Sequence, residues 1–538
     1  MSTIELAPEV NGETCEAARD VHNLHAAKRP EQRYIPYLVF ALCASLYFIP
    51  FMQLLLRGSD EGILVVGAVR TVHGQLLGRD FFEVIGPGTF YWLALFFKIF
   101  GVTFLASRIC LFVTSLGTAL SIYFLSRRVC RSYQLLPCVL VFATYFATFW
   151  PEISHHVDSN CFALLAVVCM VLWQDSKRNW LLVVAGALAG ATTLIMQPKG
   201  ILLLLAFLVW LWIQHWRRST SLTALVWVTG GCVTVVASML GYFWSQGALH
   251  DLIYANVIWP SHSYGPAFSV PYAFLISHYF THWVVPMHGI NWTVGMAAVL
   301  FIPFLFVAAL PVLVFGLGIG RGIRNMSPEV LLYWLAGSAF WLSEIHRKDI
   351  AHLVFGSPLL VILSVFYLQE RRNKGLSLAL QSLSIASVCL AGATLIVALV
   401  ARPMQTRAGR VHTAAYDPVI DAIEEHVPPG EEIFICPYAP MYYFLSATNN
   451  PTRYSTFYFN VKVGSQLAFD EVARTLDQHR VKYVLWDSNV EDRVLADLFP
   501  GRRPELFIFK PYLESHYRPI WSHDGVLLME RKSDDHAN

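Results

Sequence analysis

Residues 377–401 read SLALQSLSIASVCLAGATLIVALVA, an apolar run without a charged side chain, and the residues that follow, RPMQTRAGR at 402–410, are polar and basic. A helix needs about 20 apolar residues to cross the hydrocarbon core of a bilayer. The run is therefore predicted to be a transmembrane helix. The change of pattern at Arg402 predicts that a domain outside the membrane follows it.

The composition of the whole chain agrees with a membrane protein. Of the 538 residues, 55% are hydrophobic and 14% are charged, and the mean hydropathy is +0.49. Soluble domains carry about 25% charged residues, so a soluble enzyme is excluded. Residues 1–34 are polar and lack the short apolar core of a cleavable signal peptide, which predicts a cytoplasmic N-terminal tail and a first span that is retained.

Ten further apolar runs precede residue 377. Together they predict about eleven transmembrane helices in a membrane domain over 35–401. With the run at 377–401 included, the eleven runs lie at roughly 35–56, 103–125, 133–150, 160–174, 180–196, 200–213, 221–244, 293–318, 328–343, 353–369 and 377–401.

The charges between these runs orient the chain. One set of loops is rich in cations, whereas the opposite set is poor in them, and the stretch 245–292 has no Lys or Arg. By the positive-inside rule the first set is cytoplasmic, and an odd number of spans then places residues 402–538 outside the cytoplasm. We expect a multi-pass protein of a bacterial inner (plasma) membrane. The cations of the first set are Arg127, Arg128, Arg131, Lys177, Arg178, Arg217, Arg218, Arg321, Arg324, Arg371, Arg372 and Lys374.

Two segments are not predicted to cross the membrane. Residues 87–101, PGTFYWLALFFKIFG, are apolar but short, and counting them as a span would break the charge alternation. They are predicted to form an interfacial or re-entrant helix, with Lys98 reaching water. In 402–538, strand-like runs at 433–436, 482–486 and 526–529 and a helical pattern at 466–479 predict a small α/β domain in the periplasm or extracellular space.

The first external loop, 57–102, contains the most informative residues. It includes GSDEG at 58–62 and RDFFEVIGPGTFYW at 79–92. Its carboxylates form an acidic group next to the membrane surface. They belong to Asp60, Glu61, Asp80 and Glu83.

Geometry limits what the adjacent pair can do. Neighbouring residues on a helix point about 100° apart, so Asp60 and Glu61 cannot both face one substrate. The alternative structural reading is that Ser59 or Asp60 only caps a surface helix.

The loop resembles the first periplasmic loop of the GT-C superfamily of glycosyltransferases, which includes protein O-mannosyltransferases and the aminoarabinose transferases of lipid A. In that family an acidic pair follows the first span, and an acidic, aromatic, Gly-Pro stretch leads into a Tyr-Trp helix, as Asp60-Glu61 and residues 80–92 do here. The family often has Lys-Pro-Pro where this chain has Ile85-Gly86-Pro87. A phosphate-binding lysine is therefore not transferred to that point.

The resemblance implies an inverting GT-C enzyme that moves a hexose or pentose from a polyprenyl-phosphate donor to a lipid, glycan or protein acceptor. Phosphate is a good leaving group, so a single carboxylate base suffices, unlike the pair that glycoside hydrolysis needs. By resemblance we assign the base to Asp60, with Glu61 as the alternative. Asp80 and Glu83 would position the acceptor or raise the pKa of that base.

Cations near the external surface are candidates for the donor phosphate. The loop EIHRKDIAH at 344–352 resembles an Arg-x-Asp-x-x-His stretch of the family, and arginine suits phosphate oxygens. Its candidates are Arg347, Lys348 and His352, although such residues also anchor spans at the interface. Lys199, in QPKG at 197–200, would either meet the phosphate or simply extend to water.

A second acidic or acceptor site is possible in the loop WPEISHHVD at 150–158, with His155, His156 and Asp158. The structural alternative is that Asp158 caps the next helix. His155 and Asp158 lack an obvious third metal ligand, and the five histidines within 245–292 do not have the spacing of a ligand set. The sequence requires no cofactor, and no ligand set shows whether a divalent metal assists.

Two rival functions remain open. An O-antigen polymerase or ligase usually has key cations in one large external loop, but the loop 245–292 has none. A transporter or flippase for lipid-linked glycans predicts ionisable residues in mid-span and two similar halves, and neither is found. Under every reading the partners are membrane lipids and lipid-linked sugars, with no indication of nucleic acid.

Overall fold

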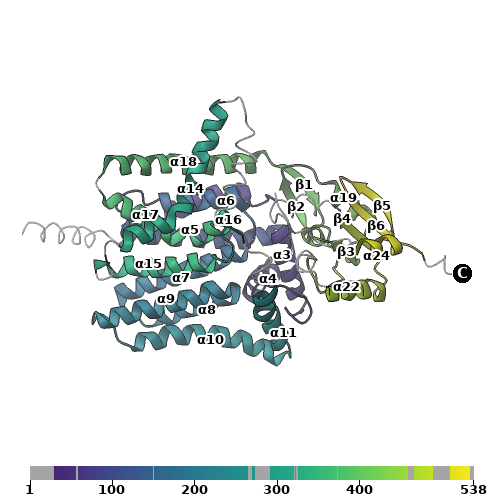
Figure 1. The fold of residues 1–538 in the computed structure, drawn as a ribbon, viewed down its shortest axis with the longest axis horizontal. Coiled ribbons are helices and arrows are strands. Elements are labelled where there is room, and N and C mark those ends of the chain that lie inside the picture. The colour runs from purple at the N-terminus through teal and green to yellow at the C-terminus, as the bar shows by residue number, and fades with distance from the viewer. Residues whose placement is uncertain are drawn as a thin grey trace, which may run out of the picture.

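The computed structural model describes residues 30–55, 59–149, 151–264, 270–272, 291–319, 322, 325–371, 373–457, 466–488 and 509–533. Long helices lie side by side in a bundle, and a smaller domain with the β-strands sits at one end of it (Figure 1). We call this end of the bundle the domain end. Two shorter helices, α3 (Ser59–Val72) and α4 (Pro87–Phe100), lie between the bundle and the domain.

A helix covers each of the apolar runs that the sequence analysis identified. Their apolar side chains also lie on the outside of the bundle, where Leu38, Val226 and Val312 are 68%, 70% and 77% exposed, as expected for a surface that faces lipid. The bundle helices are α2 (Pro30–Phe48) with η1 (Ile49–Phe51), α5 (Phe104–Val129), α6 (Leu136–Phe149), α7 (His155–Ser176), α8 (Trp180–Ile195), α9 (Gln197–Trp216), α10 (Thr223–Ser245), α14 (Asn291–Ile319), α15 (Pro328–Ser343), α16 (Ile350–Gly356), α17 (Pro358–Glu370) and α18 (Lys374–Val400).

The protein is a multi-pass membrane protein. Among the described residues, 7 helices are long and apolar enough to cross a membrane, or 8 if α16 and α17, which meet at 75°, form one broken span. Two shorter apolar helices cover Leu136–Thr148 and Trp180–Ile195. The total of about eleven spans stays a prediction.

Charged side chains at the end of the bundle opposite the domain end agree with the predicted alternation of cation-rich and cation-poor loops. Arg128, near the end of α5, binds Asp175 of α7 with an Nη2–Oδ1 distance of 2.8 Å, and it also binds Glu329 at the start of α15. The sequence analysis placed the chain at these three points on the same side of the membrane. The structure brings them together, and the side that faces the cytoplasm stays a prediction.

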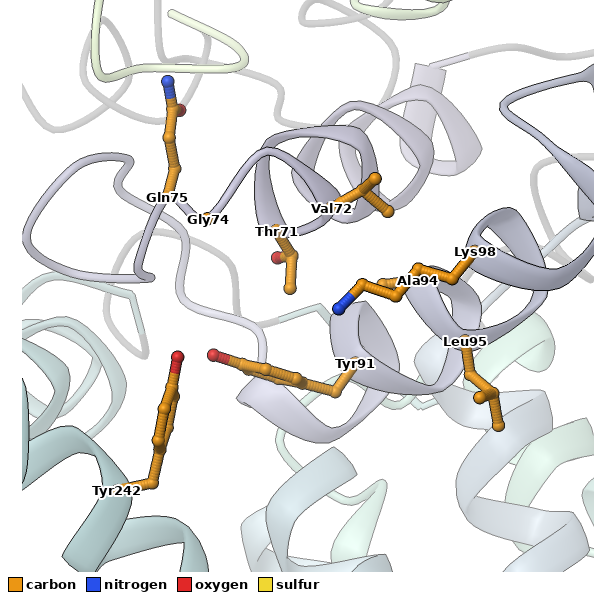
Figure 2. A pocket seen from close by; sticks show the side chains of 9 residues that line it. All are labelled: Thr71, Val72, Gly74, Gln75, Tyr91, Ala94, Leu95, Lys98 and Tyr242. Atoms are coloured by element: carbon orange, nitrogen blue, oxygen red, sulfur yellow. The ribbon is translucent and has the colours of Figure 1, made fainter.

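Helix α4 has 14 residues, which span about 21 Å of a hydrocarbon core that is about 30 Å thick, and it lies between the bundle and the C-terminal domain (Figure 1). Its residues Phe90, Leu93 and Phe97 are buried, whereas Leu95 and Lys98 are exposed. The Lys98 side chain extends along a pocket between α3, α4 and α10 (Figure 2). This two-sided pattern is typical of a helix that lies along an interface.

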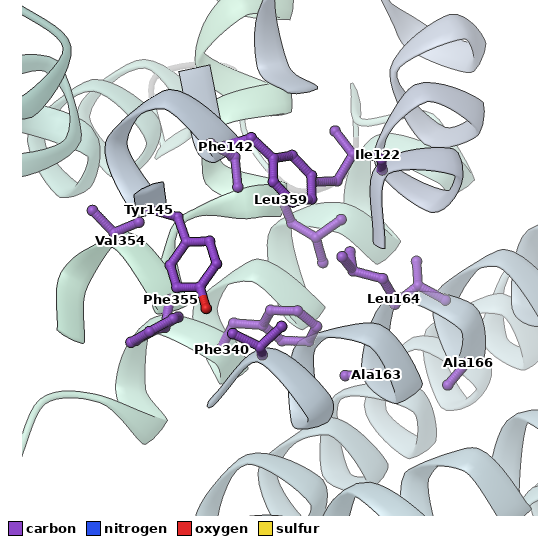
Figure 3. Close-up of a cluster of buried hydrophobic side chains, with 14 of the residues drawn as sticks. Ile122, Phe142, Tyr145, Ala163, Leu164, Ala166, Phe340, Val354, Phe355 and Leu359 are labelled. Carbon is purple, nitrogen blue, oxygen red and sulfur yellow. The ribbon is translucent and has the colours of Figure 1, made fainter. Parts of the chain in front are cut away.

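The centre of the bundle is a dense apolar core. Side chains of α6, α7, α15 and α17 point toward one another there, among them Phe142, Leu164, Phe340 and Leu359 (Figure 3). Leu164, Phe340 and Leu359 are 0% exposed. This packing fixes the relative positions of the helix ends that carry the polar groups described below.

The C-terminal domain contains two sheets. Strands β1 (Arg402–Thr406) and β2 (Gly409–Thr413) form an antiparallel hairpin, and a four-stranded sheet has the order β3-β4-β6-β5. Strands β3 and β4 are parallel, and the other neighbours are antiparallel. The predicted strands and the predicted helix are confirmed as β3, β4, β6 and α22. The remaining elements are β3 (Ile433–Cys436), β4 (Tyr483–Asp487), β5 (Tyr517–His523), β6 (Val526–Arg531), α19 (Pro418–His426), α20 (Met441–Leu445), α22 (Gln466–Gln478) and α24 (Phe509–His516).

The C-terminal domain packs directly against the membrane domain. The β2 residue His412 exchanges backbone hydrogen bonds with the end of the first span, at 2.8 Å to Leu55 N and 2.6 Å to Gln53 O. Met404 and Val411 of the hairpin belong to the same buried apolar cluster as the bundle. The β1-β2 hairpin, which the sequence analysis did not identify, is therefore the joint between the two parts.

Candidate active site

Asp60 and Glu61 occupy the first turn of α3 and have very different surroundings, as the helical geometry predicts. Glu61 is 0% exposed and faces Arg108 of α5, which is also 0% exposed. Asp60 is exposed to solvent, and its carboxylate accepts a hydrogen bond from the hydroxyl of Tyr438 in the C-terminal domain. Because α3 begins at Ser59, Asp60 lies within the helix and is not its N-cap.

The Glu61–Arg108 pair is a bidentate ion pair. Arg108 Nη1 binds Oε1, and Arg108 Nη2 donates to Oε2 at 3.0 Å and to the carbonyl of Leu54 at 2.8 Å. The backbone N–H of Ile153 donates to Glu61 Oε1 at 3.1 Å. A carboxylate held in this way joins α3, α5 and the loop before α7, and it is poorly placed to act as a base. Sequence reasoning missed Arg108, although a lone arginine in an apolar span was a signal.

Glu83 is a buried carboxylate of the acidic loop. Its side chain is 3% exposed. Burial raises the pKa of Glu83 to about 8, Ser455 and Arg70 offset only part of this effect, and the charge of Asp60 adds to it. Glu83 is therefore largely protonated at neutral pH, and it can donate a hydrogen bond as well as accept one.

Asp80 differs from Glu83 because it is paired at the surface. It binds Arg79 with an Nη2–Oδ2 distance of 2.8 Å and accepts a hydrogen bond from the backbone N–H of Leu76, also at 2.8 Å. The Arg79 hydrogen bond holds the pKa of Asp80 below its ordinary value. In this structure Asp80 closes the turn that leads to Glu83.

The segment 452–455 of the C-terminal domain covers this acidic loop. Phe82 N donates to the carbonyl of Arg453 at 2.8 Å, and Arg70 donates to the carbonyl of Thr452 at 2.9 Å. Contact at α3 is also close: a Cβ at Gly62 would lie 2.4 Å from the backbone nitrogen of Met441 in α20. Asp60 and Glu83 therefore lie where the C-terminal domain meets α3, and sequence reasoning did not predict this contact.

A second polar group lies between α7, α9 and α15 at the domain end. Lys199 of α9 is 0% exposed, and its Nζ lies 2.9 Å from Oε1 of Glu344, which follows α15. The same oxygen lies 3.1 Å from His156 Nδ1. Lys199 also donates to Asn160 Oδ1 at 2.9 Å. The Lys199 ammonium thus does not extend to water, because it is paired with the Glu344 carboxylate.

The loop before α7 differs from one expectation. The N-cap of α7 is Ser154, whose hydroxyl accepts from His156 N at 3.3 Å, and Asp158 lies inside the first turn with 3% exposure. The capping role considered for Asp158 is therefore wrong, because the helix begins one turn earlier than its apolar run. His155 is half-buried, and its ring centroid lies 4.1 Å from that of His156.

The predicted phosphate-binding loop is organised around Asp349, the N-cap of α16. Asp349 Oδ1 lies 2.7 Å from His352 Nδ1, and Asp349 Oδ2 lies 3.4 Å from Arg347 Nε. Burial alone would raise the pKa of Asp349, but His352 and Arg347 outweigh it and hold the pKa at about 2. The His352 ring lies 5.0 Å from that of His156, so this loop adjoins the Lys199 group. Lys348 is half-buried.

The acidic loop and the Lys199 group are connected through Asn256, in the π-helical turn η2 (Tyr254–Ile258). Asn256 Nδ2 donates to the carbonyls of Glu83 and Ile85 at 3.1 and 3.3 Å, and Gln197 at the start of α9 donates to its Oδ1 at 3.4 Å. A Cβ at Gly86 would lie 2.2 Å from the carbonyl oxygen of Leu194. Only glycine allows the loop to approach the α8–α9 junction this closely.

Metal ligands are not gathered at this site. Within the residues that the structure describes, no group of three or more His, Cys, Asp or Glu side chains is arranged to hold a metal ion. Of the histidines in 245–292, His250 is exposed and His262 binds backbone and Ser261, while His278, His282 and His288 lie outside the described residues.

Comparison with known proteins identifies both a related family and a related fold. Residues 85–243 match the family of dolichyl-phosphate-mannose-protein mannosyltransferases. No curated protein sequence matches the chain.

The fold is similar to that of two crystal structures of ArnT from Cupriavidus metallidurans. The structure with bound undecaprenyl phosphate has a TM-score of 0.57 at 11% identity, over 94% of this chain and 99% of that chain. The apo structure has a TM-score of 0.55 at 11% identity, over 93% and 98% of the two chains. The similarity therefore extends over the bundle and the C-terminal domain together.

Proposed function

We propose that this chain, a membrane glycosyltransferase of the GT-C superfamily, transfers a hexose or pentose from a polyprenyl-phosphate donor to a lipid, glycan or protein acceptor at the external surface of the plasma membrane. The family match and the fold support the enzyme class. The undecaprenyl phosphate bound to ArnT supports the donor class, because that ligand is what a polyprenyl-phosphate sugar leaves behind.

The observation that carries the proposal is the pair formed by Asp60 and Glu83. Both lie where the C-terminal domain meets α3 and the acidic loop: Asp60 accepts a hydrogen bond from Tyr438, and Phe82, next to Glu83, donates to the carbonyl of Arg453. Asp60 is exposed to solvent, whereas burial raises the pKa of Glu83 to about 8. Asp60 is the proposed base. Glu83, largely protonated, would donate a hydrogen bond that orients the acceptor hydroxyl.

The reaction needs one proton transfer and one displacement. Asp60 takes the proton of the acceptor hydroxyl, the acceptor oxygen forms a bond to the anomeric carbon, and the bond from that carbon to the phosphate oxygen breaks on the opposite face. The phosphate leaves with the electron pair, and the configuration at the anomeric carbon is inverted. Preorganised cations stabilise the charge that develops on the phosphate.

Arg347, Lys348 and His352 are the proposed contacts of the donor phosphate. The Arg347 side chain is 22% exposed, whereas Lys199 is fully buried against Glu344. We therefore give Lys199 a positioning role: it holds Glu344, and with it the start of the 344–352 loop. His156 supports the same loop from α7 through its contact with Glu344. An acceptor site that includes His155, His156 and Asp158 stays a prediction.

The test is transfer of radiolabelled sugar from defined polyprenyl-phosphate donors in membranes that contain the wild type, Asp60→Asn or Asp421→Asn. Asp421 is an exposed carboxylate on α19, far from the proposed base in sequence, and it controls for the loss of one negative charge. We expect turnover in the wild type and the control and at least a hundredfold loss in Asp60→Asn. Equal turnover in all three proteins would reject Asp60 as the base.

Fractionation of the same reactions identifies the acceptor. Label recovered in an organic extract would indicate a lipid acceptor, label in precipitated protein a protein, and label in the aqueous polymer fraction a glycan. If none of the donors is consumed by the wild type, the proposed donor class is wrong.

A further inference from the structure

A pocket of about 260 Å³ lies on the side of α3 and α4 that faces α10, outside the residues assigned to sugar transfer. Its polar side chains are Thr71, Gln75, Tyr91, Lys98 and Tyr242. The ammonium group of Lys98 points into the space between Thr71 and Tyr91, and the hydroxyl of Tyr91 points toward that of Tyr242 (Figure 2). The consecutive helices α3 and α4, with the residues that follow α3, and the distant helix α10 therefore line one volume with polar groups.

The chemistry of the lining favours an anion. It combines one ammonium, three hydroxyl groups and one amide, and none of the nine lining residues is acidic. The Thr71 hydroxyl donates to the carbonyl of Gly67 at 2.8 Å, so the donors left for phosphate oxygens are the Lys98 ammonium, the Gln75 amide and the tyrosine hydroxyls. The ammonium makes its hydrogen bond charge-assisted. The volume is slightly below the range of about 300–1,000 Å³ that suits drug-sized ligands, so a small head group fits better than a large molecule.

The surroundings of the pocket indicate a lipid. Leu95 on its rim is 47% exposed, and Ile99 and Phe100, which follow on α4, are 62% and 51% exposed. Tyr242 and Trp244 stand at the end of α10 with 42% and 73% exposure. Exposed Tyr and Trp at a helix end mark the head-group level of a membrane. A phosphate in the pocket would thus have apolar surface beside it on which acyl chains can lie.

We propose that this pocket binds the phosphate of an anionic phospholipid head group. The proposal does not depend on sugar transfer, because none of the polar lining residues is assigned to the reaction. The pocket is nevertheless connected to the reaction site, since Gln75 accepts a hydrogen bond from Arg70 Nε at 2.6 Å and Arg70 lies near Glu83. Lipid binding would therefore steady the arginine that faces the acidic loop.

The experiment is native mass spectrometry of the full chain in detergent, titrated with phosphatidylglycerol, phosphatidylcholine or inorganic phosphate. The proteins are the wild type, Lys98→Gln, Tyr242→Phe and the control Lys374→Gln, which neutralises an exposed lysine at the start of α18. We expect one phosphatidylglycerol to bind about tenfold more weakly to Lys98→Gln and severalfold more weakly to Tyr242→Phe. The Lys374→Gln protein should bind it as the wild type does.

Each alternative outcome decides against the proposal. Equal affinity of phosphatidylglycerol for the wild type and Lys98→Gln would remove the pocket as its site. Equal binding of phosphatidylcholine would show that the anionic head group is not recognised, and competition by inorganic phosphate at the same concentrations would show a site for free phosphate instead. Lys98 and Tyr242 are both exposed, so their variants should fold, and matching thermal unfolding temperatures would confirm this.

Discussion

The domain end of the bundle holds two kinds of carboxylate. One kind is held in buried ion pairs, and the other belongs to the proposed reaction site. Glu61 and Glu344 are 0% exposed, and each faces a fully buried cation, Arg108 or Lys199. Asp60 is exposed, and Glu83 is buried where its surroundings raise its pKa to about 8. The first kind is neutralised within the fold and joins helices. The second kind lies where the C-terminal domain meets α3, and it is the kind that we propose takes part in the reaction.

The largest effect that separates the two kinds is expected on catalysis. Asp60→Asn should lower kcat by about 10²–10⁴-fold, because general base catalysis supplies a factor of that size. The thermal unfolding temperature of the purified protein should stay close to that of the wild type, since Asp60 is exposed. A variant that loses activity only because it unfolds would place Asp60 with the structural carboxylates.

Glu61→Gln should act on stability instead. Removing one partner of a buried ion pair costs about 3–5 kcal/mol, because the other charge stays buried without its counter-ion. Thermal unfolding in detergent and the yield of folded protein measure the effect. The double variant Glu61→Gln, Arg108→Met, which removes both charges, should recover part of the loss, and no recovery would contradict the ion-pair explanation.

The raised pKa of Glu83 predicts a pH dependence of stability. Folding raises the pKa from an ordinary 4.5 to about 8, so the folded state holds the proton more tightly. Its contribution is present in full below about pH 4.5 and is lost as the pH rises to about 8, by on the order of a few kcal/mol. Unfolding measured from pH 5 to 9 should show this decline in the wild type. A Glu83→Gln variant, which stays neutral, should show a smaller decline, and identical slopes would argue against the raised pKa.

The smallest effect is expected at Tyr438, which links Asp60 to the C-terminal domain. Tyr438→Phe removes one hydrogen bond to a carboxylate, worth about 1.5–3 kcal/mol at most and less at an exposed site. We expect a severalfold change in turnover and a shift of its pH profile, because the hydroxyl contacts the proposed base. The variant Tyr416→Phe, which removes a similar contact to Asp421, is the matched control and should leave turnover unchanged.

Local sequence patterns predicted much of the fold. Each apolar run contains a helix, α4 is short and two-sided as expected, and three strands and one helix of the C-terminal domain lie close to their predicted positions. These features depend on length and periodicity, which are local properties. The β1-β2 hairpin was missed because its pairing with residues 53–55 gives it much of its support, and that contact is distant in the sequence.

The sequence likewise predicted some residues of the candidate site and missed others. The resemblance identified Asp60 and Glu83 and assigned the base to Asp60, but it kept Glu61 as an alternative and could not distinguish the surroundings of Asp60 and Glu61. Arg108 made that distinction, and it lies on a different helix 47 residues further along the chain. The segment 452–455, Asn256 and Tyr438 were not predicted either, because nothing in their local sequence marks them as neighbours of α3.

The sequence alone thus determined the membrane character, the candidate spans, the separate C-terminal domain and the acidic loop, since hydrophobicity and charge act over short stretches of chain. The tertiary structure decided which charges are matched. Glu61 and Lys199 are buried against Arg108 and Glu344, whereas Asp60 accepts a hydrogen bond from a tyrosine hydroxyl at the surface. A buried charge requires a partner, and helix packing chooses that partner from distant parts of the chain.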